Sequence, residues 1–272
     1  MAESEKAGRN LQVATIVGLA LFAVLVGSLY FNPVFYALLA AVFAGFASRE
    51  VFKIFGLRNG FMFYIGLVAI SLIVLITYFG GLKLALIVAM GTWISLSIFR
   101  LRWGPKGYAN DIGAFSVAII YIAAMLSFSV DLAHHENGFE RVFAVMLLTI
   151  ANDTGGFFVG VRFGKHKMAP IISPRKSWEG FAGGLLLQII IGVFVVPAYL
   201  LEITQLQGFV MALVLTLTAT FGDLIESAIK RDLDIKDSSD VIPGHGGVLD
   251  RVDAHLINAF VGWVFITQIF GL

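Results

Sequence analysis

Residues 222–253 read GDLIESAIKRDLDIKDSSDVIPGHGGVLDRVD, and nothing else in this chain is so polar for so long. The stretch holds seven Asp, one Glu and four Lys or Arg, and it lies between two long hydrophobic segments. Ionisable groups are costly beside hydrocarbon-spanning helices unless they meet water or a partner of opposite charge. We therefore expect this cluster to handle something charged at the surface of a bilayer.

The composition around this stretch is that of a polytopic membrane protein. Hydrophobic residues make up 58% of the 272 residues, charged residues make up only 14%, and 25 residues are Phe. This chain is too apolar for a soluble domain. It has no Cys, which excludes disulfides, thiolate metal sites and thiol nucleophiles. Any chemistry must use oxygen and nitrogen groups.

Apolar runs of roughly 20 residues, the length that crosses a bilayer, predict an all-α fold with about nine transmembrane helices. Asn32-Pro33 separates the first two runs, and Gly80-Gly81 predicts a tight turn between the third and fourth. We interpret the first run as a retained helix, because it is too long for a signal peptide and lacks a cleavage site. The expected spans are residues 11–31, 34–52, 61–79, 82–99, 112–130, 142–163, 178–201, 209–229 and 254–272.

Positive charge alternates along these nine spans. With this count, 17 of the 19 Lys and Arg fall on one side, and only Lys83 and Arg141 fall on the other. Because cytoplasmic loops carry the excess of Lys and Arg, we expect a multi-pass protein of the cell membrane with a cytoplasmic N-terminus. The 222–253 cluster then faces the cytoplasm, where nucleotides are found.

The chain divides by expected role into two regions. Residues 1–110 form N-terminal transmembrane helices, a candidate scaffold or dimer region. Residues 111–272 form a catalytic region with cytoplasmic loops at 164–178 and 230–253, and long loops in so compact a protein are usually functional. The composition is compatible with a homodimer without requiring one, and no nucleic-acid partner is expected.

Carboxylates in the polar stretch suggest a metal site. If the eighth span continues as a helix, residues 223, 226, 227 and 230 share one face, and Asp250 and Asp253 lie three residues apart just before the ninth span. Hard oxygen ligands favour Mg²⁺, which is typically held by one or two carboxylates and substrate phosphates. The alternative is a solvated loop with salt bridges at the helix ends. The candidate ligands are Asp223, Asp250, Glu226 and Asp253.

Two loops have features that suit phosphate binding. The sequence PGHGG at 243–247 can expose backbone N–H groups to an anion, although a simple Gly-rich turn is the alternative. In SPRKSWEG at 173–180, Arg175 and Lys176 suit phosphate oxygens. Ser177 is expected to cap the next helix, with Glu179 in its first turn. The alternative is a capped helix entry whose cations only obey the positive-inside rule.

Asp153 is exceptional because it lies near the middle of the sixth span. An ionisable residue there must pair or face a polar cavity, so Asn152 and Asp153 are expected to line the same cavity as the polar cluster. An interhelical hydrogen bond is the alternative. The spacings Gly156-Gly160 and Gly160-Gly164 predict close helix packing rather than ligand binding.

The polar stretch closely resembles a family signature. From Ser227 to Asp253 it reads S-x-I-K-R, four residues, K-D-x-S, two residues, then I-P-x-H-G-G-V-x-D-R-V-D. This looks like the complete signature of the phosphatidate cytidylyltransferases, also called CDP-diacylglycerol synthases. SPRKS-x-EG at 173–180 and NDT at 152–154 resemble further motifs of that family, whereas the N-terminal half resembles it only in hydropathy.

The resemblance implies that CTP and phosphatidate react to give CDP-diacylglycerol and pyrophosphate, with Mg²⁺ as cofactor and a second cation such as K⁺ left open. The expected catalytic residues are Asp223 and Asp250, which would hold the divalent ion, and Lys230. The expected substrate-binding residues are Ser173, Arg175, Lys176, Ser177, Ser227, Arg231, Lys236, Asp237, His245, Gly246, Gly247, Arg251 and Asp153.

Three other functions are alternatives to this one. A CTP-dependent lipid kinase, such as a polyprenol kinase, would use a similar site but transfer the γ-phosphoryl group; the full signature argues against it. A cation-coupled transporter would use Asp153 and the carboxylates as an ion path, yet the polar residues gather on one side and no inverted repeat is visible. A membrane scaffold without catalysis would leave the 222–253 cluster unexplained.

Overall fold

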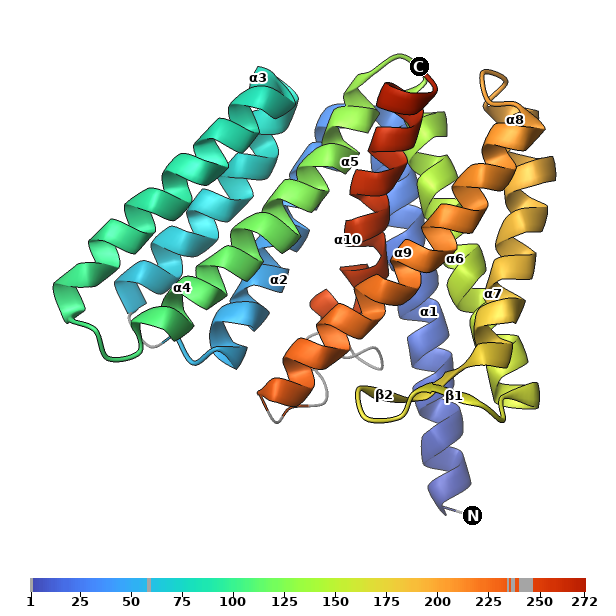
Figure 1. Cartoon of the computed structure of the whole chain (residues 1–272), viewed down its shortest axis with the longest axis horizontal. Helices are drawn as coiled ribbons and strands as arrows, with labels where there is room; N and C mark the ends of the chain where they lie inside the picture. Colours follow the sequence, from blue (N-terminus) through green and yellow to red (C-terminus); the bar gives the residue numbers. More distant parts are fainter. Residues whose placement is uncertain (1, 58–59, 234, 236–237, 240–246) are drawn as a thin grey trace. The chain divides into compact units, whose positions relative to one another are not determined.

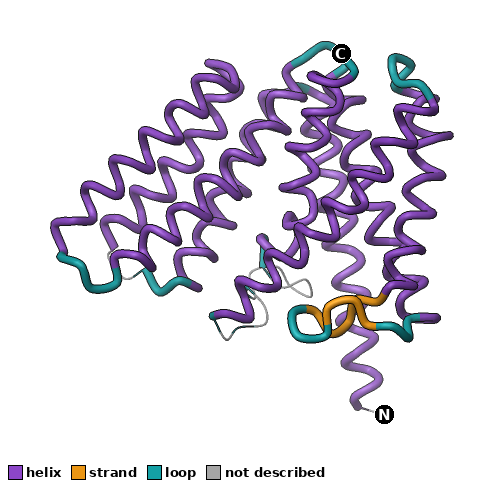
Figure 2. The backbone as a smooth tube through the Cα atoms, viewed as in Figure 1, coloured by secondary structure: helices purple, strands orange, loops and turns teal. Residues whose placement is uncertain are grey.

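The computed structural model describes residues 2–57, 60–233, 235, 238–239 and 247–272, with side chains from residue 16 onward. Nearly all of this part of the chain is helical, as Figures 1 and 2 show. Seven helices of the described residues are long and apolar enough to cross a membrane. The all-α membrane architecture is therefore confirmed, and the count of nine spans stays a prediction.

The chain forms two compact units. One holds residues 1–131 and 235–251, and the other holds residues 132–234 and 252–272. The boundary predicted at residue 110 separated roles rather than packing units, and it stays a prediction.

The first unit is a bundle of long helices. Its elements are α1 (Ala2–Phe31), α2 (Pro33–Ile54), α3 (Gly60–Arg100), the 3₁₀ turn η1 (Leu101–Trp103), α4 (Tyr108–Ser116), the π-helix η2 (Val117–Ala124) and the start of α5 (Met125–His134). Asn32 caps α2 by accepting a hydrogen bond from the Val34 N–H at 2.9 Å, and Pro33 occupies the first turn. The predicted break at Asn32-Pro33 is confirmed.

A glycine turn folds α3 into two antiparallel halves. Gly81 has φ 79° and ψ 162°, a backbone conformation that residues with a Cβ rarely adopt. The two halves lie side by side in Figure 1. The turn predicted at Gly80-Gly81 is therefore confirmed.

Arg100 joins the end of α3 to the segment that leads into α4. Its Nε donates to Asp111 at 2.5 Å, and its Nη atoms donate to the carbonyls of Gly104 and Lys106 at 2.8 and 2.7 Å. Only 5% of Arg100 is exposed. The guanidinium thus satisfies three acceptors and fixes this connection.

The second unit contains α6 (Gly138–Phe163), α7 (Trp178–Ile190), the π-helix η3 (Ile191–Val195), α8 (Val196–Tyr199) and α9 (Gln205–Asp232). It also contains most of α10 (Leu249–Trp263) and the π-helix η4 (Val264–Ile269). A small antiparallel hairpin of β1 (Lys167–Ala169) and β2 (Ser173–Ser177) leads into α7, with Lys167 paired to Ser177. The sequence had not predicted this hairpin, drawn in orange in Figure 2, within the 164–178 loop.

Glycines bring α6 and α7 into backbone contact. An added Cβ on Gly155 would lie 2.5 Å from the Gly183 carbonyl oxygen, and one on Gly160 would lie 3.5 Å from the Gly180 Cα. Small residues allow membrane helices to approach this closely. The close helix packing predicted for Gly156 and Gly160 is confirmed, and the prediction that they serve packing rather than ligand binding stays a prediction.

Buried side-chain hydrogen bonds connect the other helices of this unit. Thr218 of α9 donates to the Asn258 side chain of α10 at 2.6 Å, and Asn258 donates to Thr149 of α6 at 2.9 Å. These bonds link three helices in a setting where an unpaired polar group would be costly.

Helix α10 begins earlier than predicted. Its first residue is Leu249, so Asp250 and Asp253 lie within the helix rather than before it. Carboxylates are favourable in the first turn of a helix, because the backbone N–H groups there have no partner within the helix. Asp250 and Asp253, which suggested a loop in the sequence, therefore lie in the first turns of a helix.

We expect Gly155→Ala to destabilise the second unit by about 1–3 kcal/mol, the usual cost of overpacking a tight contact. The lost stability should appear as a lower midpoint of thermal unfolding in detergent. Gly91→Ala is the matched control, because a Cβ at this exposed helical position meets nothing within 4 Å. Equal unfolding midpoints for the two variants would contradict the packing assignment.

Candidate active site

A pocket of about 230 Å³ lies among α6, the hairpin strand β2, α7 and α9 in the second unit. It brings together several residues predicted from separate motifs. Its lining consists of Asn152, Asp153, Gly156, Phe157, Gly160, Met168, Arg175, Lys176, Ser177, Gly180, Phe181, Thr220 and Asp223. Asn152 and Asp153 line this pocket together with Asp223 of the polar stretch, as predicted, and the role of Asp153 in substrate binding stays a prediction.

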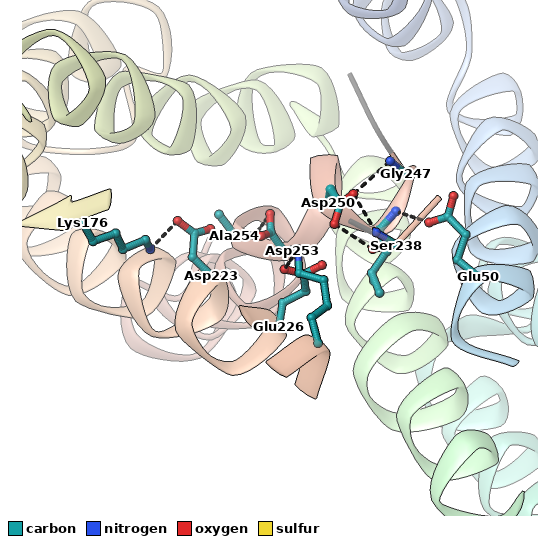
Figure 3. A network of polar contacts seen from close by, with 11 residues as sticks. Glu50, Lys176, Asp223, Glu226, Ser238, Gly247, Asp250, Asp253 and Ala254 are labelled. Atoms are coloured by element: carbon teal, nitrogen blue, oxygen red, sulfur yellow. Dashed lines mark hydrogen bonds and ion pairs between the residues drawn. The ribbon is translucent and has the colours of Figure 1, made fainter. Parts of the chain in front are cut away.

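An ion pair crosses this pocket from β2 to α9. The Lys176 ammonium lies 2.5 Å from an Asp223 carboxylate oxygen and 3.4 Å from the Thr220 carbonyl oxygen. Figure 3 shows this pair. The side chains of Lys176 and Asp223 are 24% and 27% exposed, and both line the pocket. A cation and a carboxylate therefore stand together where a charged ligand can reach both.

Hydrogen bonds fix the segment that supplies these cations. Ser177 is buried, has an extended backbone and accepts a hydrogen bond from the Gly180 N–H at 3.2 Å, so its predicted N-cap role is confirmed. Glu179 accepts hydrogen bonds from the backbone N–H groups of Lys165 and His166 at 3.1 and 3.2 Å, and it contacts His166 Nδ1 at 2.6 Å. Both ends of the hairpin are thereby held at the start of α7, and Arg175 stays exposed at the pocket.

Carboxylates accumulate where α9 and α10 approach each other. Asp253 interacts electrostatically with Asp223, Glu226 and Asp153. The approach is close because Gly222 has no side chain: a Cβ there would lie 3.0 Å from the Asp253 carbonyl oxygen. Negative charge concentrated in this way attracts cations.

Glu226 and Lys230 form an ion pair within α9. Their side chains are 3% and 12% exposed, and the charged atoms lie 2.7 Å apart. The predicted shared face of α9 is thus real, and on it the Lys230 charge compensates a buried carboxylate.

A second polar cluster lies in the first unit. Asp250 accepts hydrogen bonds from Ser238 Oγ at 2.7 Å, from the Ser238 N–H at 3.2 Å and from the Gly247 N–H at 2.9 Å. Glu50 of α2 accepts hydrogen bonds from the backbone N–H groups of Val248 and Leu249 at 2.9 and 2.8 Å. The two carboxylates together hold the entry to α10.

Sequence reasoning missed Glu50. Glu50 lies beside Arg49 and Lys53 at the end of the second predicted span, in no motif. A carboxylate beside two cations is typical of an exposed helix end. The sequence therefore did not indicate that Glu50 is 2% exposed and hydrogen-bonded to residues about 200 positions away. Thr220, which the pocket also includes, lacked any motif.

The remaining predicted residues are distributed as follows. Ser173 begins β2 and is half-buried, Ser227 is half-buried in α9, Arg231 is exposed near the end of α9, and Arg251 is exposed in α10. The pocket lining includes none of these four. Lys236, Asp237, His245 and Gly246 lie outside the described residues.

The donor set suits a hard cation. Asp223 and Asp253 supply carboxylate oxygens, the ligands that Mg²⁺ prefers in proteins. Within the described part of the chain, no three His, Asp or Glu side chains are close enough to form a complete cluster of ligands. In proteins, Mg²⁺ is usually held by one or two carboxylates together with substrate phosphates.

Comparison with known proteins identifies the family. A model of the cytidylyltransferase family matches residues 12–269. The chain is 36% identical to a phosphatidate cytidylyltransferase of Mycobacterium bovis, over 97% of this chain and 91% of that protein. It is 37% identical to the Mycobacterium leprae enzyme of the same name, over 96% of this chain and 89% of that protein. It is also 35% identical to the Bacillus subtilis one, over 54% of this chain and 55% of that protein. The signature at 227–253, the pocket and these matches agree, and the chain belongs to the cytidylyltransferase family.

Proposed function

We propose that this chain is a phosphatidate cytidylyltransferase, a membrane nucleotidyltransferase of phospholipid biosynthesis. It transfers the cytidylyl group of CTP to phosphatidate and releases pyrophosphate. The observation that carries this conclusion is 36% identity over 97% of the chain to an enzyme of that name. Such coverage includes both units and every described residue of the pocket.

The pocket has the chemistry that these substrates require. Both substrates are phosphate anions, one soluble and one held in the membrane by its acyl chains. Arg175 and Lys176 supply a planar fork and a point charge for phosphate oxygens. The long apolar helices place these cations in a membrane protein, where a lipid substrate can be reached.

The reaction needs no protein nucleophile. An oxygen of the ionised lipid phosphate attacks the α-phosphorus of CTP and forms a new phosphorus–oxygen bond. The bond from the α-phosphorus to the oxygen bridging to the β-phosphorus breaks, and the electron pair leaves with pyrophosphate. Since the attacking oxygen carries no proton, no general base is required, and positioning and charge stabilisation supply the rate enhancement.

Lys176 and Asp223 are the proposed centre of this chemistry. A triphosphate that enters the pocket competes with Asp223 for the Lys176 ammonium. Lys176 then exchanges the Asp223 carboxylate for a phosphate oxygen. Arg175 extends the cationic surface, and Asp153 lines the same pocket. Lys230 stays a proposed catalytic residue. Further residues stay proposed for substrate binding: Ser173, Ser177, Ser227, Arg231, Arg251, Lys236, Asp237, His245, Gly246 and Gly247.

We also propose Mg²⁺ as the cofactor. Asp223 and Asp253 would hold it, and Asp250 and Glu226 stay proposed as further ligands. When bound, a divalent ion neutralises charge on the phosphates and on the leaving group. We propose that this site lies on the cytoplasmic side. The pocket residues Arg175 and Lys176 belong to the 17 Lys and Arg predicted on one side of the membrane, and cytoplasmic loops carry the excess of positive charge.

A direct assay of the products tests the function. Purified full-length protein is incubated with phosphatidate, Mg²⁺ and CTP labelled in the cytosine ring. We expect the label to enter lipid and pyrophosphate to appear in equal amount, because the cytidylyl group is transferred. Formation of CDP with a lipid alcohol would identify a lipid kinase instead, and intact CTP with every lipid tried would refute both activities.

Asp223→Asn should lower the turnover number at least about 100-fold, the scale on which one preorganised charge acts in a transition state. The change keeps the shape of the side chain but removes the charge that faces Lys176 and the proposed cation. Asp232→Asn, at the exposed end of the same helix, is the control and should keep wild-type turnover. Near-normal turnover of Asp223→Asn in folded protein would remove this residue from the site.

Lys176→Gln should lower kcat/KM for CTP about 10- to 100-fold, because a charge-assisted contact to phosphate is lost. Lys167→Gln is the matched control: Lys167 is exposed, belongs to the same hairpin and does not line the pocket. Steady-state kinetics at varied CTP separate the two. An equal loss in both variants would indicate a general effect of charge on the hairpin.

A further inference from the structure

Glu50 is a buried carboxylate that contacts the polar stretch from another helix. It lies in α2, is 2% exposed, and accepts three hydrogen bonds. The donors are Ser239 Oγ and the Val248 N–H to Oε1, at 2.5 and 2.9 Å, and the Leu249 N–H to Oε2, at 2.8 Å. The Glu50 side chain therefore binds both Ser239 and the residues at the start of α10, Val248 and Leu249.

Asp250 binds the same segment from within. Its oxygens accept hydrogen bonds from the hydroxyl and N–H of Ser238 and from the Gly247 N–H. Figure 3 shows Asp250 between Ser238 and Gly247. Ser238 and Ser239 are adjacent, and so are Gly247 and Val248, so each carboxylate bridges the same two short stretches. Glu50 and Asp250 thus form a double clamp on residues 238–239 and 247–249.

The clamp depends on negative charge and on two acceptor oxygens. The first N–H groups of a helix have no partner within the helix, and the positive end of the helix dipole favours an anion there. A buried carboxylate is costly unless it is fully hydrogen-bonded. Glu50 meets that condition with three donors, whereas an amide in its place would present an NH₂ group to at least one of them.

We propose that Glu50 is a positioning residue for the cytidylyl transfer: it holds Asp250 and the start of α10 in the arrangement that binds CTP. This inference rests on the proposed function. Asp250 lies in the clamp, and Asp253 lies one turn further along the helix whose first N–H groups Glu50 binds. Loosening the clamp lowers the fraction of molecules that are competent to bind nucleotide, and the apparent affinity falls by that fraction.

The test is steady-state kinetics of full-length Glu50→Gln in detergent, with CTP and phosphatidate varied in turn. We expect KM for CTP to rise about 10- to 100-fold, because a buried carboxylate loses charge-assisted hydrogen bonds. KM for phosphatidate should stay near the wild-type value. Hydrogen exchange of the peptide over residues 247–257 should be faster in the variant, since the Val248 and Leu249 amides lose their acceptor.

Asp111→Asn is the matched control. Asp111 is a carboxylate of the same unit, 15% exposed and bound to Arg100, and it has no place in the proposed site. This change should lower the unfolding temperature and leave KM for CTP unchanged. If Glu50→Gln behaves in the same way, with a lower yield of active enzyme but a wild-type KM for CTP, then Glu50 only stabilises the fold and the inference is wrong.

Ser239→Ala provides a second route if Glu50→Gln does not fold. It keeps Glu50 and both backbone donors and removes one hydrogen bond, so KM for CTP should rise by a smaller factor, roughly 3- to 10-fold. An unchanged KM for CTP there would overturn the positioning role. Absence of cytidylyl transfer in the wild type is a different result, because it overturns the proposed function itself and the role of Glu50 with it.

Discussion

The structure depends on compensating carboxylates at the ends of apolar helices. Three buried or half-buried acids near the polar stretch have matched partners: Asp223 has Lys176, Glu226 has Lys230, and Glu50 has three hydrogen-bond donors. Without these partners the charges would oppose folding, because removing one member of a buried pair costs several kcal/mol, about 3–5. Lys176 and Asp223 are also the centre of the proposed site, so stability and phosphate chemistry share this pair of groups.

The two units solve this problem in different ways. In the second unit, side-chain cations from β2 and α9 meet the acids, and these ion pairs can exchange for a charged ligand. In the first unit, Glu50 and Asp250 are met largely by backbone N–H groups, which have a fixed position and cannot leave. One cluster is therefore suited to exchange of anions, and the other is suited to holding a segment of chain.

Sequence reasoning predicted the features that depend on local pattern. Hydropathy predicted the membrane helices. The sequences Asn32-Pro33 and Gly80-Gly81 predicted two breaks between them, and Ser177 was predicted to cap a helix. The motif residues Asp153, Lys176 and Asp223 do meet at one pocket. What the sequence did not predict arises from long-range packing: the contact of Glu50 with Leu249, the first residue of α10, has no local pattern. The hairpin was missed because its two strands have only three and five residues.

The glycine contact between α6 and α7 has a consequence for how substrate preference can change. Gly156, Gly160 and Gly180 all line the pocket, so backbone rather than side chains makes that wall. A backbone wall has no rotamers, and a larger residue there would separate the helices instead of reshaping the cavity. Substitutions that change substrate preference are thus confined to the other walls of the pocket. There the side chains of Phe157, Phe181 and Met168 can be replaced one at a time.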